Sequence, residues 1–493
     1  MKNIKNPISI DYLFTLLEGR KMNYRKLLFI FGFGICAWGN TSQSADEPLG
    51  TAITNVTIID AVNGIRKNQT VFFREDSITK IQNASENIQG YQTINGDGKF
   101  LIPGLWDFHV HLSYEDSLID KMPALLLSYG ITSVRDTGGM LDKLLPIVES
   151  MKNPDSVAPR VFYSGPLLDG RDVVYDGKSR PHIGVQNIDA QSAQTRIQFL
   201  KSQGASFIKI YELVSPRVFE AMVGAAREHG MPIDSHVPLS MRAGVAGAFV
   251  DSIEHLRNIE LDCARDSEAL HEERLAILKN ADRLPGFTLR SNLHRLQRIP
   301  AIRNFSRDQC LTTLSAMPTT LQVPTLRLNS LALNPPFERT DWSSAFSGLP
   351  RNTQSDWDRQ IRIQSGSRLA NTEFAKWSLF LVGLMKEQGL PIGAGTDTPI
   401  GFAIPGYSLH AELQMLVRAG LTPMDALRSA TLEPAKFFKL SEEMGSIDVK
   451  KKADMLLLDK DPLIDISNTR AITHVISRGR AFNPESLSSA ASN

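Results

Sequence analysis

One stretch decides how this chain is interpreted: Leu101-Ile-Pro-Gly-Leu-Trp-Asp-Phe-His-Val-His-Leu112. Its apolar residues predict a β-strand over 102–111, in which successive side chains point to opposite faces. Asp107, His109 and His111 then share one face, and two imidazoles at a strand end form half of a metal site. A polar strand face at a sheet edge is the alternative interpretation of the two histidines taken alone.

Length and composition indicate a globular protein with a small partner. The 493 residues are 42% hydrophobic and 22% charged, with a formal net charge of +1. Such a chain can build one large core and an accessory domain. A nearly neutral chain lacks the basic signature of nucleic-acid or anionic-membrane binding. We expect a small-molecule or short-peptide substrate, no nucleic acid and no stable membrane span, and a homo-oligomer stays open.

The first 45 residues predict a secretory signal peptide rather than part of the fold. Residues 21–26 carry positive charge, 27–38 form an apolar run too short to cross a bilayer, and small residues follow around a cleavage point. Translation starts at Met1 or at Met22. The signal predicts a secreted or periplasmic protein.

The three cysteines leave two questions open. Cys36 could carry a lipid anchor, although the residues before it match a lipobox poorly. Cys263 and Cys310 either pair in an oxidising compartment or remain two buried thiols.

Both ends of the mature chain predict β-structure. Residues 46–101 and 441–482 contain short runs with period-two alternation between turn residues. We expect one small β-sandwich domain built from these two segments, followed by a flexible tail over 483–493.

The middle of the chain, residues 102–440, alternates apolar strands with amphipathic helices. The eight candidate strands are 102–111, 131–135, 160–164, 207–211, 232–236, 252–255, 322–326 and 391–395. Eight βα units predict an α/β fold of the (β/α)8 TIM-barrel type, whose chemistry lies where the strands end. Two insertions, at about 262–321 and 329–368, exceed ordinary loops and could form a lid or pack extra helices on the barrel.

Polar residues capable of binding a metal follow five of these strands. They are His109, His111, Lys209, His236, His255 and Asp397. Because the carboxyl ends of barrel strands meet at one rim, we expect the six side chains to converge.

With these residues in place, the chain resembles the metal-dependent amidohydrolase superfamily over residues 50 to 482. Within it, the chain is most similar to the imidazolonepropionase-like branch, which includes Xaa-Pro dipeptidases, N-acyl amino acid hydrolases and organophosphate-cleaving relatives. The motifs that carry the resemblance are Pro103-Gly-Leu-Trp-Asp-Phe-His-Val-His111, Gly130-Ile-Thr-Ser-Val-Arg-Asp-Thr-Gly-Gly139, Gly204-Ala-Ser-Phe-Ile-Lys-Ile-Tyr211, Asp234-Ser-His-Val-Pro238, Ser252-Ile-Glu-His-Leu256 and Gly395-Thr-Asp-Thr398.

The resemblance implies a binuclear site. His109, His111 and Asp397 would bind one divalent ion, His236 and His255 a second, and Lys209 would bridge them as its carbamate. Zn²⁺ suits these ligands best, although Mn²⁺ or Co²⁺ would also fit. Asp397 would also act as general acid and base for a metal-bridging hydroxide.

Lys209 has two interpretations, a carbamate and an ordinary lysine. An ammonium cannot bind a cation, whereas a carbamate offers two anionic oxygens, and burial beside Phe207 and Tyr211 favours the neutral amine that reacts with CO₂. The alternative is an ordinary lysine that pairs with a carboxylate such as Asp234 or Asp397.

Four further residues are candidates for substrate contact: Tyr211, His182, Arg257 and Arg327. The two arginines could bind a substrate carboxylate. We assign His229, His271, His294 and His474 to the surface or the core.

The sequence therefore predicts a binuclear hydrolase that cleaves an amide, in a dipeptide such as Xaa-Pro or in an N-acyl amino acid. Hydrolysis of a lactone or phosphotriester on the same site is the alternative reaction. A non-catalytic binding protein on the same fold is the third hypothesis.

Overall fold

A computed structural model describes residues 48–84, 87–178, 180–281, 284–366 and 372–487 of the chain. They belong to one compact unit that begins at Pro48. The predicted signal peptide, residues 1–45, lies outside the described residues, as do Met22 and Cys36. Among the described helices, none is long and apolar enough to cross a membrane.

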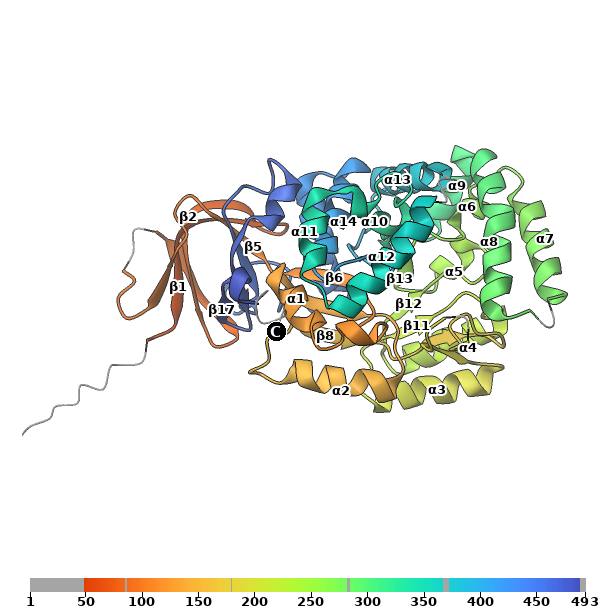
Figure 1. The fold of residues 1–493 in the computed structure, drawn as a ribbon, viewed down its shortest axis with the longest axis horizontal. Coiled ribbons are helices and arrows are strands. Elements are labelled where there is room, and N and C mark those ends of the chain that lie inside the picture. The colour runs from red at the N-terminus through yellow and green to blue at the C-terminus, as the bar shows by residue number, and fades with distance from the viewer. Residues whose placement is uncertain (1–47, 85–86, 179, 282–283, 367–371, 488–493) are drawn as a thin grey trace, which may run out of the picture. The chain divides into compact units, whose positions relative to one another are not determined.

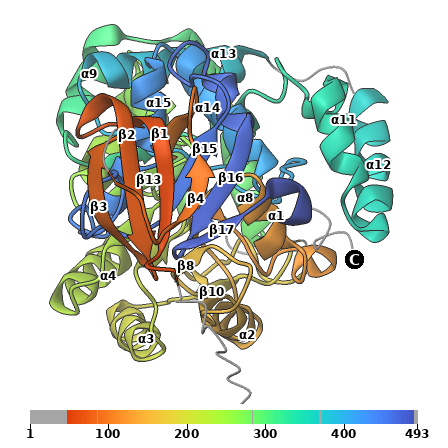
Figure 2. The same ribbon diagram turned by 90° about the vertical axis from the view of Figure 1, so that its left-hand side faces the viewer.

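Strands from both ends of the chain pair in a single eight-stranded sheet (Figure 2). Its members are β1 (Thr51–Asp60), β2 (Gly64–Arg74), β3 (Ser77–Asn83), β4 (Gln92–Asn95), β5 (Phe100–Pro103), β15 (Met455–Leu458), β16 (Ile472–Ser477) and β17 (Arg480–Phe482). The two ends meet where β5 and β15 pair antiparallel, with Met455 opposite Pro103. Since the strand pairing defines one sheet, the two-layered β-sandwich stays a prediction.

The predicted strand over 102–111 is two strands rather than one. β5 ends at Pro103, and β6 (Leu105–Val110) starts a different, parallel sheet. Gly104 separates them: its backbone N–H donates to the Asp454 carbonyl, and a Cβ there would lie 2.1 Å from Thr132 Oγ1. Only glycine permits this close approach. The stretch therefore contributes one strand to each of two sheets.

Parallel strands form the middle of the chain. β6, β7 (Ile131–Asp136) and β8 (Arg160–Tyr163) make one sheet. A second sheet contains, in spatial order, β10 (Gly184–Gln186), β9 (Leu167–Asp169), β11 (Ile208–Ile210), β12 (Ile233–Ser235), β13 (Ser252–Glu254) and β14 (Leu321–Val323). Residues 391–398, predicted to begin with a strand, join the two sheets through single parallel bridges, Gln322 with Ile392 and Val110 with Thr398. The core is thus TIM-barrel-like, and a continuous closed barrel of eight strands stays a prediction.

Helices alternate with these strands, as predicted for βα units. They are α1 (Met122–Ser128), α2 (Leu141–Lys152), α3 (Ala190–Ser202), α4 (Pro216–Glu228), α5 (Ala243–Gly247), α13 (Thr372–Glu387), α14 (Tyr407–Arg418), α15 (Pro423–Ser429) and α16 (Leu432–Phe437). Local sequence explains where two of them begin. Asp189 and Ser192 form a capping box for α3, and Thr422 and Asp425 form another for α15.

The two predicted insertions are mostly helical (Figure 1). The first holds α6 (Ile259–Asp262), α7 (Ser267–Lys279), α8 (Gly286–Arg303) and α9 (Arg307–Ser315). The second follows α10 (Leu326–Asn329) and holds α11 (Thr340–Ser347) and α12 (Arg351–Gly366). Short 3-10 turns lie at Asp116–Leu118, Pro336–Glu338 and Ile466–Arg470.

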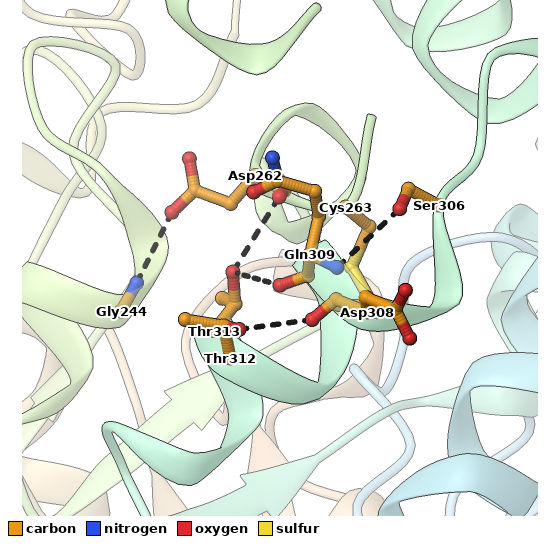
Figure 3. Close-up of a disulfide and its surroundings, with 9 residues drawn as sticks. Gly244, Asp262, Cys263, Ser306, Asp308, Gln309, Thr312 and Thr313 are labelled. Carbon is orange, nitrogen blue, oxygen red and sulfur yellow. Dashed lines mark hydrogen bonds between the residues drawn. A yellow bond between two sulfur atoms is a disulfide. The ribbon is translucent and has the colours of Figure 1, made fainter. Parts of the chain in front are cut away.

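A disulfide closes the first insertion. Cys263, which follows α6, is bonded to Cys310 on α9, and both residues are buried. Figure 3 shows hydrogen bonds around it, including the Gln309 backbone N–H that donates to Ser306 Oγ. The structure thus pairs the two cysteines that the sequence left open.

We predict that this disulfide contributes measurably to stability. Its ends are 47 residues apart, and closing a loop of that size in the unfolded chain stabilises the native state by up to about 4 kcal/mol. The double variant Cys263→Ser/Cys310→Ser should therefore unfold at lower urea concentration. A reductant should shift the wild-type curve and leave the variant's curve in place. An unchanged midpoint in the double variant would contradict the prediction.

Candidate metal centre

The carboxyl ends of the parallel strands surround a cavity of about 290 Å³. All six predicted metal ligands line it: His109, His111, Lys209, His236, His255 and Asp397. Each of the six is at least 95% buried. The structure thus brings together side chains from β6, β11 and the ends of β12 and β13, with one from the segment that joins the two sheets.

Three of these side chains meet at one point. Asp397 Oδ1 lies 3.3 Å from His109 Nε2 and 3.2 Å from His111 Nε2. One ligand atom from each residue lies within 4.8 Å of the others. Gly395 allows this approach, because a Cβ there would come 2.7 Å from the Cβ of His109. A single cation can therefore be bound by all three residues.

The other two histidines extend this group across the cavity. The His255 ring lies 4.6 Å from the His109 ring and 4.9 Å from the His236 ring, between centroids. Tyr211 packs beside them, with its ring 4.4 Å from that of His236. The four imidazole rings form a continuous row, which could supply ligands to more than one metal ion.

Every one of the four imidazoles is held through Nδ1. The acceptors or partners are the Glu254 carboxylate for His109, the Gly138 carbonyl for His111, the Glu212 carboxylate for His236 and the Thr325 hydroxyl for His255. This arrangement leaves all four Nε2 atoms for the cavity. Histidines that bind metals are oriented in this way, because a bond at one ring nitrogen fixes the other.

Lys209 has a carboxylate partner. Its Nζ lies 2.9 Å from Asp234 Oδ2, and both side chains are fully buried. Arg135 contacts this carboxylate and a second one. It pairs with Glu254, and its guanidinium lies 3.7 Å from Asp234 Oδ2. This ion pair is the contact with Asp234 that the second interpretation of Lys209 predicts.

The electrostatics suit a bound cation. Burial lowers the pKa of His109, but the Glu254 and Asp397 carboxylates outweigh it and raise that pKa to about 9. Burial and the Lys209 charge lower the pKa of His236 to about 3. Burial opposes ionisation of Asp397, yet the neighbouring imidazoles hold its pKa well below the usual value. An ionised carboxylate beside imidazoles is a donor set for a divalent metal, and the metal would replace the proton that the raised pKa of His109 otherwise retains.

Three residues beside this cavity have strained backbone conformations. His255, Thr325 and Asp397 have φ of 62°, 45° and 61°, in the left-handed region that residues with a Cβ adopt only at a cost of about 1–3 kcal/mol. Such conformations persist where the surrounding structure enforces them, often at functional sites. The strain here orients two candidate ligands and the hydroxyl that holds one of them.

The four predicted substrate contacts have different surroundings. Tyr211 and Arg257 line the cavity. His182 is exposed, forms a bridge with Asp176 and is absent from the lining. Arg327 is buried and donates to the carbonyls of Thr396, Ile400 and Gly401, so it steadies the segment that carries Asp397 rather than facing the cavity.

Glu212 is a site residue that the sequence analysis missed. It is fully buried, accepts from His236 Nδ1 at 2.9 Å, and is bonded to Arg290 and His294 of α8 at 3.1 and 2.6 Å. Burial would raise its pKa, but Arg290 and His294 hold that pKa well below the usual value. The signal that could have revealed it is its position two residues past the strand, next to Tyr211. Its partners on α8 could not be inferred, because they come from an insertion.

Comparisons with known proteins found a family match and several similar proteins. Residues 376–482 match the profile described as the amidohydrolase family. The chain is 34% identical over 99 residues to an ochratoxinase of Aspergillus niger, covering 19% of this chain and 20% of that protein. It is 29% identical over 92 residues to an imidazolonepropionase of Brevibacillus brevis, covering 18% of this chain and 22% of that one. The matched region thus spans about a fifth of the curated relatives' length.

The fold similarity extends much further along the chain. A crystal structure of a Xaa-Pro dipeptidase with bound methionine in its active site superposes with a TM-score of 0.62. The superposition covers 88% of this chain and 99% of that one, at 19% sequence identity. At this identity the similarity shows a shared TIM-barrel-like fold.

We predict that Glu212 controls metal affinity through His236. Glu212→Gln keeps the side-chain size but removes the charge that holds the imidazole, and losing such a partner weakens metal binding by about 10- to 100-fold. Competition with a fluorescent chelator would measure the dissociation constants. Glu387→Gln, at an exposed ion pair with Arg307, is the matched control. Equal affinities in the Glu212→Gln and wild-type chains would contradict the prediction.

Proposed function

Since the chain carries an amidohydrolase family domain, we propose that it is a metal-dependent hydrolase that cleaves an amide bond. The substrate is a dipeptide such as Xaa-Pro or an N-acyl amino acid. One observation carries the proposal: four imidazoles, each held at Nδ1, present Nε2 to one buried cavity that also holds Asp397. A binding protein without catalysis has no physical need for such an arrangement.

Two divalent ions, most simply Zn²⁺, fit this donor set. His109, His111 and Asp397 would hold one, and His236 and His255 the other. Lys209 would join them as its carbamate. The buried position of Lys209 in the lining of the cavity that the four imidazoles share supports this role, because burial favours the neutral amine that reacts with CO₂.

When bound, the ions would supply a water activated at neutral pH and would polarise the scissile carbonyl. Asp397 provides the proton transfer: its carboxylate is ionised and can accept a proton from water and deliver it to the leaving nitrogen. Tyr211 forms part of the wall beside His236 and can donate a hydrogen bond to the substrate. The burial of all these groups keeps bulk water away from the reacting atoms.

Arg257 supports a substrate with a free carboxylate. It lines the cavity with Arg180 and Arg290, so three arginines contribute to the same lining as the imidazoles. Among the residues that the structure describes, Glu212 is the carboxylate within ion-pair distance of Arg257, at 3.5 Å, and it already binds Arg290. The excess of positive charge favours an anionic group next to the scissile amide.

We further propose that the protein is located outside the cytoplasm, and that its fold comprises a closed barrel and a β-sandwich. A buried disulfide is typical of proteins from oxidising compartments and supports secretion or a periplasmic location. The bridges at residues 391–398 support a closed (β/α)8 barrel. β4 and β5 both pair with β1, at different residues of that strand. This arrangement supports a terminal sheet that folds back on itself as a β-sandwich.

The decisive experiment combines metal analysis with turnover. We expect close to two transition-metal ions per purified chain, and hydrolysis of Xaa-Pro dipeptides or N-acyl amino acids in a panel that also contains lactones and paraoxon-like esters. Asp397→Asn should lower turnover by about 10²- to 10⁴-fold, because the proton carrier is lost. Asp356→Asn, at an exposed pair with Arg359, is the matched control.

Three outcomes would count against the proposal. A chain that hydrolyses esters or lactones but no amide would replace it with the alternative reaction. A chain without metal and without turnover would favour a binding protein. Unchanged turnover in Asp397→Asn would remove this residue from the reaction.

We also predict that Arg257 selects for the substrate carboxylate. Arg257→Gln should raise KM about 10-fold for N-acyl amino acids, since a hydrogen bond to a charged group contributes about 1.5–3 kcal/mol. The corresponding carboxamides should be unaffected, and Arg257→Lys should restore part of the loss. Steady-state kinetics on the acid and carboxamide pair would measure this. A KM increase of the same size for both would contradict the prediction.

A further inference from the structure

A second, more open groove adjoins the metal cavity along α8. It has a volume of about 540 Å³ and is lined by Arg257, Arg290, Ser291, His294, Arg295, Arg298, Ile299 and Phe374. Arg257, Arg290 and Phe374 line both spaces. The two spaces are therefore neighbours that share these three side chains.

The groove has more positive charges than carboxylates to neutralise them. Four arginines line it, and the carboxylates that pair with them are Glu212 and Glu260. Glu212 is shared by Arg257, Arg290 and His294, and Glu260 binds Arg298 at 3.2 Å. Both carboxylates are fully buried, so they cannot be displaced by a ligand at the surface.

Arg295 differs from the other three arginines. It is exposed, and no hydrogen bond, ion pair or ring contact holds it within the part of the chain that the structure describes. Arg298 is held in place by Glu260, by His294 Nδ1 at 2.7 Å and by the Phe374 ring at 4.3 Å. A fixed guanidinium beside a free one suits the planar, two-oxygen geometry of a carboxylate.

We propose that this groove binds a second carboxylate of the substrate, so that the chain prefers amides whose leaving amino acid is acidic. The inference rests on the proposed function, in which Arg257 binds the α-carboxylate. Because Arg257 lines both spaces, an α-carboxylate bound there would bring the adjoining side chain to the edge of the groove that Arg295 and Arg298 line. Aspartate and glutamate carry their second carboxylate only a few bonds from the first, and glutamine is the uncharged analogue of equal size.

Equilibrium binding tests the groove without turnover. Calorimetry on the full-length Asp397→Asn chain would compare N-acetyl-L-glutamate with N-acetyl-L-glutamine. We expect the glutamate derivative to bind about fivefold more tightly, with a preference that shrinks as salt is added, since one exposed charge pair gives a contribution of this order. Equal affinities for the two ligands, or binding of neither, would overturn the proposal.

Variants at Arg295 sharpen the test, because this residue is exposed and its replacement leaves the buried carboxylates paired. Arg295→Gln should reduce the preference for glutamate about threefold, and Arg295→Glu should reverse it. Arg307→Gln, which removes an equally exposed arginine of α9 paired with Glu387, should leave the preference unchanged. A preference that survives in Arg295→Glu would overturn the assignment.

Kinetics separates failure of the groove from failure of the proposed function. If the metal-loaded wild-type chain hydrolyses both derivatives with equal kcat/KM, the groove proposal is wrong and the amidase proposal stands. If the Asp397→Asn chain prefers N-acetyl-L-glutamate but the wild-type chain hydrolyses no amide, the groove stands and the amidase proposal is wrong.

Discussion

The structure depends on one constraint: a buried polar group must be paired. Each imidazole that reaches the cavity satisfies the constraint at Nδ1, and the partner determines which way Nε2 points. Because the four partners come from different elements, the cavity is shaped by contacts outside it as much as by its own lining. The convergence of nitrogen atoms at Asp397 follows from these bonds.

The same constraint operates inside the barrel-like core. Arg135 is fully buried, lies 3.8 Å from the Phe108 ring, and donates to the Phe108 carbonyl, Ser252 and Glu254. Glu254 in turn holds His109. An unpaired charge at this depth would be costly. The bonds from Arg135 to Glu254 and from Glu254 to His109 therefore connect the site to the strands of the core. Changes deep in the core are therefore expected to affect the site.

The first insertion contributes side chains to the site and does not only cover the surface. Its α8 supplies Arg290 and His294 to Glu212, and so reaches His236 through one carboxylate. The same helix lines both the cavity and the adjoining groove. The disulfide between Cys263 and Cys310 closes the segment that contains α7 and α8. Support for the metal ligands and recognition of the substrate are thereby linked in one segment.

The sequence by itself determined which residues could meet at the strand ends. Alternation along the His109 and His111 strand and the polar residues after later strands predict one rim of ligands, because parallel strands of such a fold end at the same side. The predicted strands near 131, 160, 208, 233 and 252 also appear in the structure. Local patterns of this kind depend on neighbours a few residues apart, which the sequence displays directly.

Only the tertiary structure decided the rest. It divided the strand at Gly104, turned Arg327 onto backbone carbonyls, left His182 exposed, and joined Glu212 to residues 78 and 82 positions away. It also paired Cys263 with Cys310 and gave Lys209 a carboxylate partner. Each of these outcomes depends on which groups become buried together. That depends on long-range packing, which no local pattern in the sequence encodes.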